Sequence, residues 1–186
     1  SLQDRQLIAN RLKFISEETS IPIVLVGMPW ATTIADEPQW ASRLICRRVI
    51  PYFKLTEDLK VFVRFLMGLA LKMPFKVAPK LEDQHTTLAL FSVSSGEIRK
   101  LKHILNEAVK IALLAGAETL AKEHMSEVVT LLFPDKQNPF LQRVNEIECR
   151  EVQSYSRYDP RALSQDEKLI ATRFTKNMSL TQLLKK

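Results

Sequence analysis

The sequence predicts a protein that begins as an α/β structure and continues as an all-helical domain. Two observations predict this fold class. A short run of β-branched residues follows an early helix, and four segments with helical periodicity come later. The composition agrees, because 46% of the 186 residues are hydrophobic and only four are glycines. We therefore expect the last strands of a parallel sheet, then a helical domain, and finally a polar C-terminal tail.

The first part of the predicted α/β domain contains a helix and a strand. Residues 2–19 carry apolar side chains at helical spacing. Residues 21–27 form a continuous apolar run, which is typical of a strand buried on both faces of a parallel sheet. The loop that follows this strand lies where open α/β sheets usually bind ligands.

The predicted α/β domain ends at residue 55. We expect a short helix over residues 37–47 and an edge strand over 49–55, since Pro51 suits the border of a sheet. Two strands cannot form a stable sheet alone. We therefore expect the earlier strands of this sheet to precede Ser1.

Residues 56–133 are predicted to form a separate helical domain. Its four helices are expected over residues 56–73, 81–93, 96–115 and 123–133. In the third helix, Ser94 or Ser95 can cap the N-terminus, and Glu97 suits the first turn. Arg99 lies near the positive end of the helix dipole, which disfavours a cation unless an anion is nearby. Arg99 is therefore a candidate anion-binding residue, and the alternative is a solvated arginine on the helix surface.

Residues 134–186 are predicted to form a polar C-terminal tail. The segment 134–140 is typical of a linker, and short helices are expected within 165–174 and 179–184. The tail has few apolar residues for a core of its own, so we expect it to dock on another surface.

The composition limits the classes of protein. The net charge of +6 is compatible with nucleic-acid binding, although no basic block is dense. The longest apolar stretch, residues 61–75, contains Arg64 and Lys72 and is too short to span a bilayer. Cys46 and Cys149 lack metal-type spacing, which indicates reduced thiols in a cytoplasmic protein.

The chain lacks the common catalytic motifs. Its glycines are isolated and form no phosphate-binding loop. The three histidines have no cysteine or histidine at metal-ligand spacing, so no metal site is expected. No Gly-x-Ser-x-Gly turn supports a nucleophile.

Arginines are the remaining candidates for chemistry. Arg43, Arg47 and Arg48 lie at the end of the second predicted helix. An arginine can neutralise charge on a transferred phosphoryl group, and one supplied by a neighbouring subunit can accelerate hydrolysis strongly. For Arg47 and Arg48 the alternative is a cation favoured by the C-terminal end of the helix dipole.

Three segments resemble a known family. They are Ile23-Val24-Leu25-Val26-Gly27-Met28-Pro29, Gln39-Trp40-Ala41-Ser42-Arg43-Leu44 and Ser95-Gly96-Glu97-Ile98-Arg99-Lys100-Leu101. Together with the order of elements, they resemble the C-terminal portion of an AAA+ ATPase, closest to the TniB/TnsC branch of transposition regulators. The resemblance covers residues 1–133 and implies that 56–133 is the helical lid of an AAA+ module.

The resemblance implies roles for several arginines. Arg43 matches the arginine finger, which acts on the ATP of a neighbouring subunit, and Arg99 matches the sensor-2 arginine of the lid. Arg47 and Arg48 remain alternatives for the finger and candidates for DNA contacts. The strand over 23–27 would end at sensor 1.

The resemblance also implies a function. Members of this family are ATP-dependent oligomers, rings or filaments, that assemble on double-stranded DNA. They link a target-selection protein to the transposase subunits. ATP and Mg²⁺ would be bound mainly by residues outside residues 1–186, so we expect the chain alone to be inactive as an ATPase. The tail from Asn138 would dock transposase subunits.

Two alternatives remain open. The first is a non-enzymatic adaptor whose helical domain and tail bind protein partners without nucleotide. The second is a different AAA+ protein, such as an origin-binding or clamp-loading ATPase. A Gly-x-x-x-x-Gly-Lys-Ser/Thr loop preceding Ser1 would favour an ATPase over the adaptor.

Overall fold

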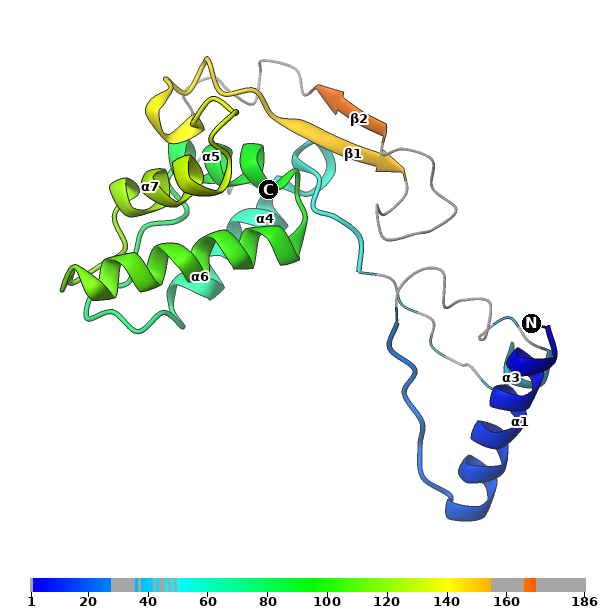
Figure 1. Ribbon diagram of the computed structural model, residues 1–186. Coiled ribbons are helices and arrows are strands. Elements are labelled where there is room, and N and C mark those ends of the chain that lie inside the picture. The colour runs from blue at the N-terminus through cyan, green and yellow to red at the C-terminus, as the bar shows by residue number, and fades with distance from the viewer. Residues whose placement is uncertain are drawn as a thin grey trace. The chain divides into compact units, whose positions relative to one another are not determined.

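The computed structural model describes residues 2–27, 36, 38–41, 43, 46, 48, 50–154 and 166–169. The chain divides into two compact units: unit 1 comprises residues 1–50 and 154–166, and unit 2 comprises residues 51–153 and 167–186. Helices account for most of the secondary structure in the described ranges (Figure 1).

Two helices are formed by the residues of unit 1 that the structure describes. The predicted first helix is confirmed as α1, Leu2–Thr19, and α3, Pro38–Ala41, packs against it. The apolar side chains of α1 are largely exposed, and Phe14 has 63% of its surface accessible. Of the predicted helix 37–47, the described helical part is limited to α3. In the part of unit 1 that the structure describes, the four-residue helix α3 leaves these apolar side chains of α1 exposed.

The two strands predicted for the α/β domain are not formed in the described residues. Residues 21–27 have no secondary structure, and Val24 and Val26 are 83% and 92% exposed. The residues described within 49–55 also contain no strand, and Leu55 begins a helix. A strand depends on hydrogen bonds to a neighbouring strand, and none of the described strands pairs with either segment. The β-branched pattern was therefore an insufficient predictor of these strands.

Unit 2 contains the four helices predicted for the helical domain. They are α4, Leu55–Ala70; α5, Gln84–Ser94; α6, Ile98–Leu114; and α7, Lys122–Leu132. The beginning of α5 differs from the prediction by three residues, because the Asp83 side chain caps this helix and accepts the Thr86 N–H at 3.2 Å. In Figure 1, α6 and α7 lie side by side, in agreement with their contacts.

One hydrophobic core joins these helices. Phe62 of α4 and Phe91 of α5 are fully buried, and their rings meet edge to face with centroids 5.3 Å apart. From α6, Leu101 and Ile104 are also fully buried. Fully burying a large apolar side chain stabilises a fold by roughly 1.5–3 kcal/mol, so these residues are the main source of stability in unit 2.

Part of the predicted tail belongs to this core. A 3-10 turn, η2, Pro139–Leu141, precedes the strands β1, Arg150–Ser154, and β2, Asp166–Leu169, which pair as a two-stranded sheet. Phe140, Ile147 and Cys149 are buried within the core of the helices. This part of the tail therefore packs on the chain's own helices, and the docking of transposase subunits on the tail stays a prediction.

The end of the tail differs from the prediction where it is described. Residues 166–169 form β2 rather than the beginning of the helix expected over 165–174. The pairing with β1 explains the difference, since hydrogen bonds to a neighbouring strand outweigh the weak helical propensity of a short segment. The helix expected over 179–184 lies outside the described residues.

Candidate functional site

The turn between α5 and α6 differs from the predicted N-terminal cap. Ser94 is the last residue of α5, and its hydroxyl donates to the Leu90 carbonyl at 2.7 Å. Ser95 has a left-handed backbone conformation with φ of 50° and ends α5. Glu97 is instead the N-cap residue of α6, and its side chain does not form a capping hydrogen bond to this helix. Both serines thus serve the end of α5 rather than the beginning of α6.

Gly96 fixes the position at which α6 begins. Its φ is +78°, and its carbonyl accepts the Phe53 N–H at 3.0 Å. A Cβ atom at this position would lie 2.1 Å from the Phe53 carbonyl oxygen, so only glycine allows the two backbones to approach this closely. The Phe53 ring packs in turn on Phe62, with centroids 5.2 Å apart. The start of α6 is therefore held against the core.

Arg99 is exposed in the first turn of α6, which begins at Ile98. The first N–H groups of a helix carry a partial positive charge, and a guanidinium in the same turn adds a full one. Such an arrangement attracts an anion, and an arginine fork matches the oxygens of a phosphate. The predicted location of Arg99 is confirmed, and its role as a phosphate sensor stays a prediction.

The other predicted arginines belong to unit 1. Arg43 is exposed and its guanidinium forms an ion pair of 2.8 Å with Glu17 of α1. Arg48 is exposed. Arg47 lies outside the described residues, as do Thr32 and Thr33, which are the hydroxyl residues of the loop after residues 21–27. Arg43 and Arg48 are in a different unit from Arg99, and the structure describes each unit separately.

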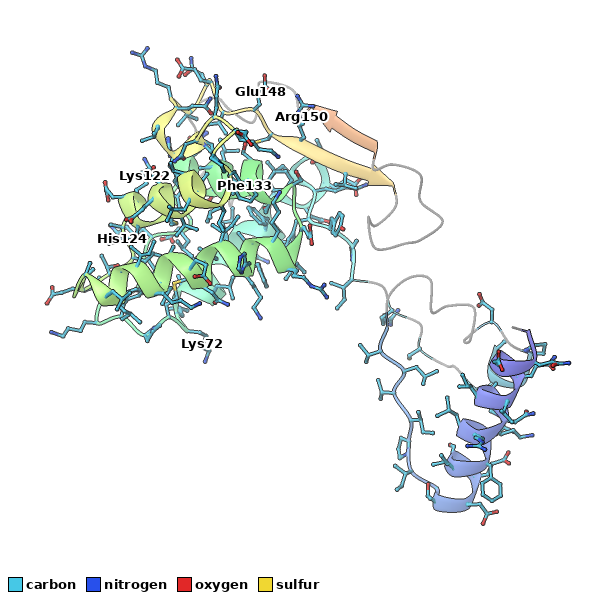
Figure 2. All side chains as sticks on the ribbon, viewed as in Figure 1. Lys72, Lys122, His124, Phe133, Glu148 and Arg150 are labelled. Carbon is cyan, nitrogen blue, oxygen red and sulfur yellow. The ribbon has the colours of Figure 1, made fainter. Side chains whose placement is uncertain are left out.

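Unit 2 contains a cavity of about 410 Å³ that the sequence analysis did not predict. We name it the basic cavity, because its charged lining residues are Lys100, Lys136, Arg150 and Glu148. The Phe133 ring forms part of its wall, and the ammonium groups of both lysines lie 5.1 and 5.8 Å from the ring centroid. Figure 2 shows Phe133 after α7, and Glu148 and Arg150 where β1 begins.

A buried carboxylate connects the tail to the first helix of unit 2. Glu151 of β1 is 2% exposed, and its two carboxylate oxygens accept the N–H and the hydroxyl of Thr56, at 2.7 and 2.8 Å. Thr56 lies in the first turn of α4, where N–H groups lack partners within the helix. Glu151 therefore supplies a cap for α4 from a position 95 residues away.

The described residues offer little for metal or thiol chemistry. No group of three or more histidine, cysteine, aspartate or glutamate side chains in the described ranges could hold a metal ion. Burial, and secondly the charge of Glu151, raise the pKa of the Cys149 thiol to about 12. This thiol stays protonated at neutral pH and is a poor nucleophile. No helix within the described ranges is long and apolar enough to cross a membrane.

Comparison with known proteins identifies no family for this chain: no protein-family model matches it, and no curated protein does. The function is therefore inferred from the geometry of unit 2 and from the sequence resemblance. The two relevant features are the first turn of α6 and the basic cavity.

Proposed function

We propose that this chain is part of an ATP-dependent regulator of DNA transposition, of the AAA+ class, in which the helices α4–α7 form the lid. One observation carries the proposal: Arg99 is exposed in the first turn of α6, directly after a glycine turn packed against Phe53. This geometry suits a guanidinium that senses the γ-phosphate of ATP, because α6 is held in place while Arg99 faces solvent.

In this proposal the hydrolytic site lies between subunits of a homo-oligomer on double-stranded DNA. Arg99 contacts the ATP of its own subunit, and Arg43 reaches the ATP of a neighbour, with Arg47 and Arg48 as alternatives. Residues outside this chain hold the ATP and Mg²⁺. The oligomer then connects the target-selection protein to transposase subunits. The ion pair of Arg43 with Glu17 is exposed and therefore weak, so it does not prevent Arg43 from engaging a phosphate.

The test is ATP turnover by the full-length protein in the presence of DNA. We expect Arg99→Ala to lower turnover about a hundredfold, which is typical for loss of one positioned phosphate-binding group. The matched control is Lys102→Ala, which removes an exposed cation of the same helix. Equal turnover of the wild type and Arg99→Ala would contradict the proposal.

The Arg43 assignment requires a separate measurement. We expect Arg43→Ala to reduce turnover by about a thousandfold or more, while oligomers still assemble on DNA. Mixing this variant with a subunit that lacks ATP-binding capacity tests action between subunits, because only neighbouring pairs with both functions would hydrolyse ATP. Full turnover of Arg43→Ala would move the finger to Arg47 or Arg48.

A protein-binding adaptor is the second candidate, and the exposed apolar side chains of unit 1 favour it. Phe14, Val24 and Val26 are each more than half exposed. Under the adaptor proposal these side chains belong to one apolar patch, and contiguous apolar patches are typical of interaction surfaces. The adaptor would bind its partner without nucleotide, and Arg99→Ala would leave that binding unchanged.

A further inference from the structure

The charged side chains of the basic cavity give its lining a net positive charge. Lys100, Lys136 and Arg150 each contribute one positive charge, and Glu148 contributes one negative charge, so the lining carries +2. The Arg150 guanidinium lies 3.5 Å from a Glu148 carboxylate oxygen, which is a long and exposed ion pair. Such a pair contributes little to stability, so Arg150 can turn toward a ligand at small cost.

We propose that the basic cavity binds a small organic phosphate monoester. A phosphate monoester carries a charge of about −2 at pH 7, which matches the net charge of the lining. A carboxylate carries −1, which is less than the net charge of the lining. The arginine fork and the two ammonium groups are also the donors that phosphate oxygens bind in proteins.

The apolar part of the wall explains why the ligand is an organic ester rather than phosphate alone. Val93 and Val129 line the cavity together with the Phe133 ring. The volume of about 410 Å³ lies within the range of roughly 300–1,000 Å³ that small-molecule pockets occupy. The organic group would pack on these side chains while the phosphate contacts the cations.

The site is separate from the proposed nucleotide sensor. Arg99 is not one of the residues that line the basic cavity, although its neighbour Lys100 is. All lining residues belong to unit 2, so the cavity requires no nucleotide and no second subunit. The proposal therefore stands or fails independently of the ATPase.

The experiment is a titration of the 186-residue chain with phenyl phosphate, followed by amide chemical shifts and by calorimetry. We expect saturable shifts around Val93, Phe133 and Arg150. Binding should be at least about tenfold tighter than that of benzoate, a monoanion with the same ring, because the second negative charge of the phosphate strengthens its charge-assisted hydrogen bonds to the cations of the lining. Inorganic phosphate should bind more weakly than phenyl phosphate, because it lacks the ring.

Variants locate the site. The double substitution Lys136→Gln and Arg150→Gln should weaken phenyl phosphate binding at least about tenfold. Lys72→Gln is the matched control, since Lys72 is exposed and does not line the cavity (Figure 2). Glu148→Gln should tighten binding about two- to fivefold, since a repulsive charge and a competitor for Arg150 are both removed. A misfolded protein could not produce tighter binding.

Several outcomes would overturn the proposal. Equal binding of benzoate and phenyl phosphate would show that the cavity does not select a dianion. Equal binding of inorganic phosphate and phenyl phosphate would remove the role of the apolar wall. Loss of binding in Arg99→Ala, with the double variant unaffected, would place the ligand at the first turn of α6 instead.

Discussion

Two helices of similar length, one in each unit, have opposite environments. The helix α1 has 18 residues and α6 has 17. In α1, Phe14 and Ile15 are 63% and 49% exposed, whereas Leu101 and Ile104 of α6 are fully buried. Both helices were predicted from their periodicity. The difference shows that periodicity predicts a helix, while burial depends on what packs against it, and α6 packs against α5 and α7.

The test with the largest expected effect replaces one phenylalanine by alanine in each unit. Phe62→Ala should lower the free energy of unfolding by about 3–5 kcal/mol, because it leaves a cavity in the core. Phe14→Ala should change it by less than about 0.5 kcal/mol, because the ring is exposed. Urea denaturation followed by circular dichroism measures both. A loss at Phe14 comparable to that at Phe62 would show that α1 is buried in solution.

The second test concerns the N-terminal border of unit 2, where Phe53 meets Gly96. Gly96→Ala should lower the free energy of unfolding by about 2–4 kcal/mol. The alanine would have a left-handed backbone conformation, and its Cβ atom would overlap the Phe53 carbonyl oxygen. Gly116→Ala is the control: its φ is +68°, but an added Cβ has nothing within 4 Å. It should cost only about 1–2 kcal/mol. Thermal unfolding of the two variants measures how much stability each loses, and the difference between them reports the overlap with Phe53. Equal losses of stability would show that the close approach of Gly96 to Phe53 does not matter.

The test with the smallest expected effect concerns β1, near the end of the segment 51–153 of unit 2. Glu151→Gln should lower the free energy of unfolding by about 1–3 kcal/mol. The two carboxylate oxygens of Glu151 each accept a hydrogen bond from Thr56, whereas a glutamine amide has a single oxygen that can accept. The control is Glu118→Gln, which removes an exposed ion pair with Lys76 and should cost less than about 1 kcal/mol. If the two substitutions had the same effect in urea denaturation, β1 would not be part of the folded unit.

The sequence predicted the helices of unit 2 because local patterns determine them. Their apolar spacing follows one face, as in α6, and a single capping residue such as Asp83 shifts a boundary by only a few residues. The strands were predicted wrongly because strand pairing depends on residues far away in the chain. Residues 21–27 have the composition of a buried strand without a described neighbour, and 166–169 form a strand through β1.

The two features of the candidate site also differ in whether the sequence predicts them. The location of Arg99 in the first turn of α6 follows from local periodicity, and it is confirmed. The basic cavity could not be predicted, because Lys136 and Arg150 come to Lys100 through the packing of the tail. The burial of Phe140 and Ile147 brings the tail to the helices, and no local pattern shows where such residues dock.

The bond between Glu151 and Thr56 also has a consequence for the order of folding. It closes a loop of 95 residues, which costs about 4 kcal/mol of chain entropy if the two residues meet in an unfolded chain. The bond therefore forms after the helices have shortened that distance, late on the folding pathway. Contacts that form late influence unfolding rather than folding. We therefore expect the tail to detach first when unit 2 unfolds. The interaction of Glu151 with Thr56 would then influence the unfolding rate, and with it the lifetime of the folded state.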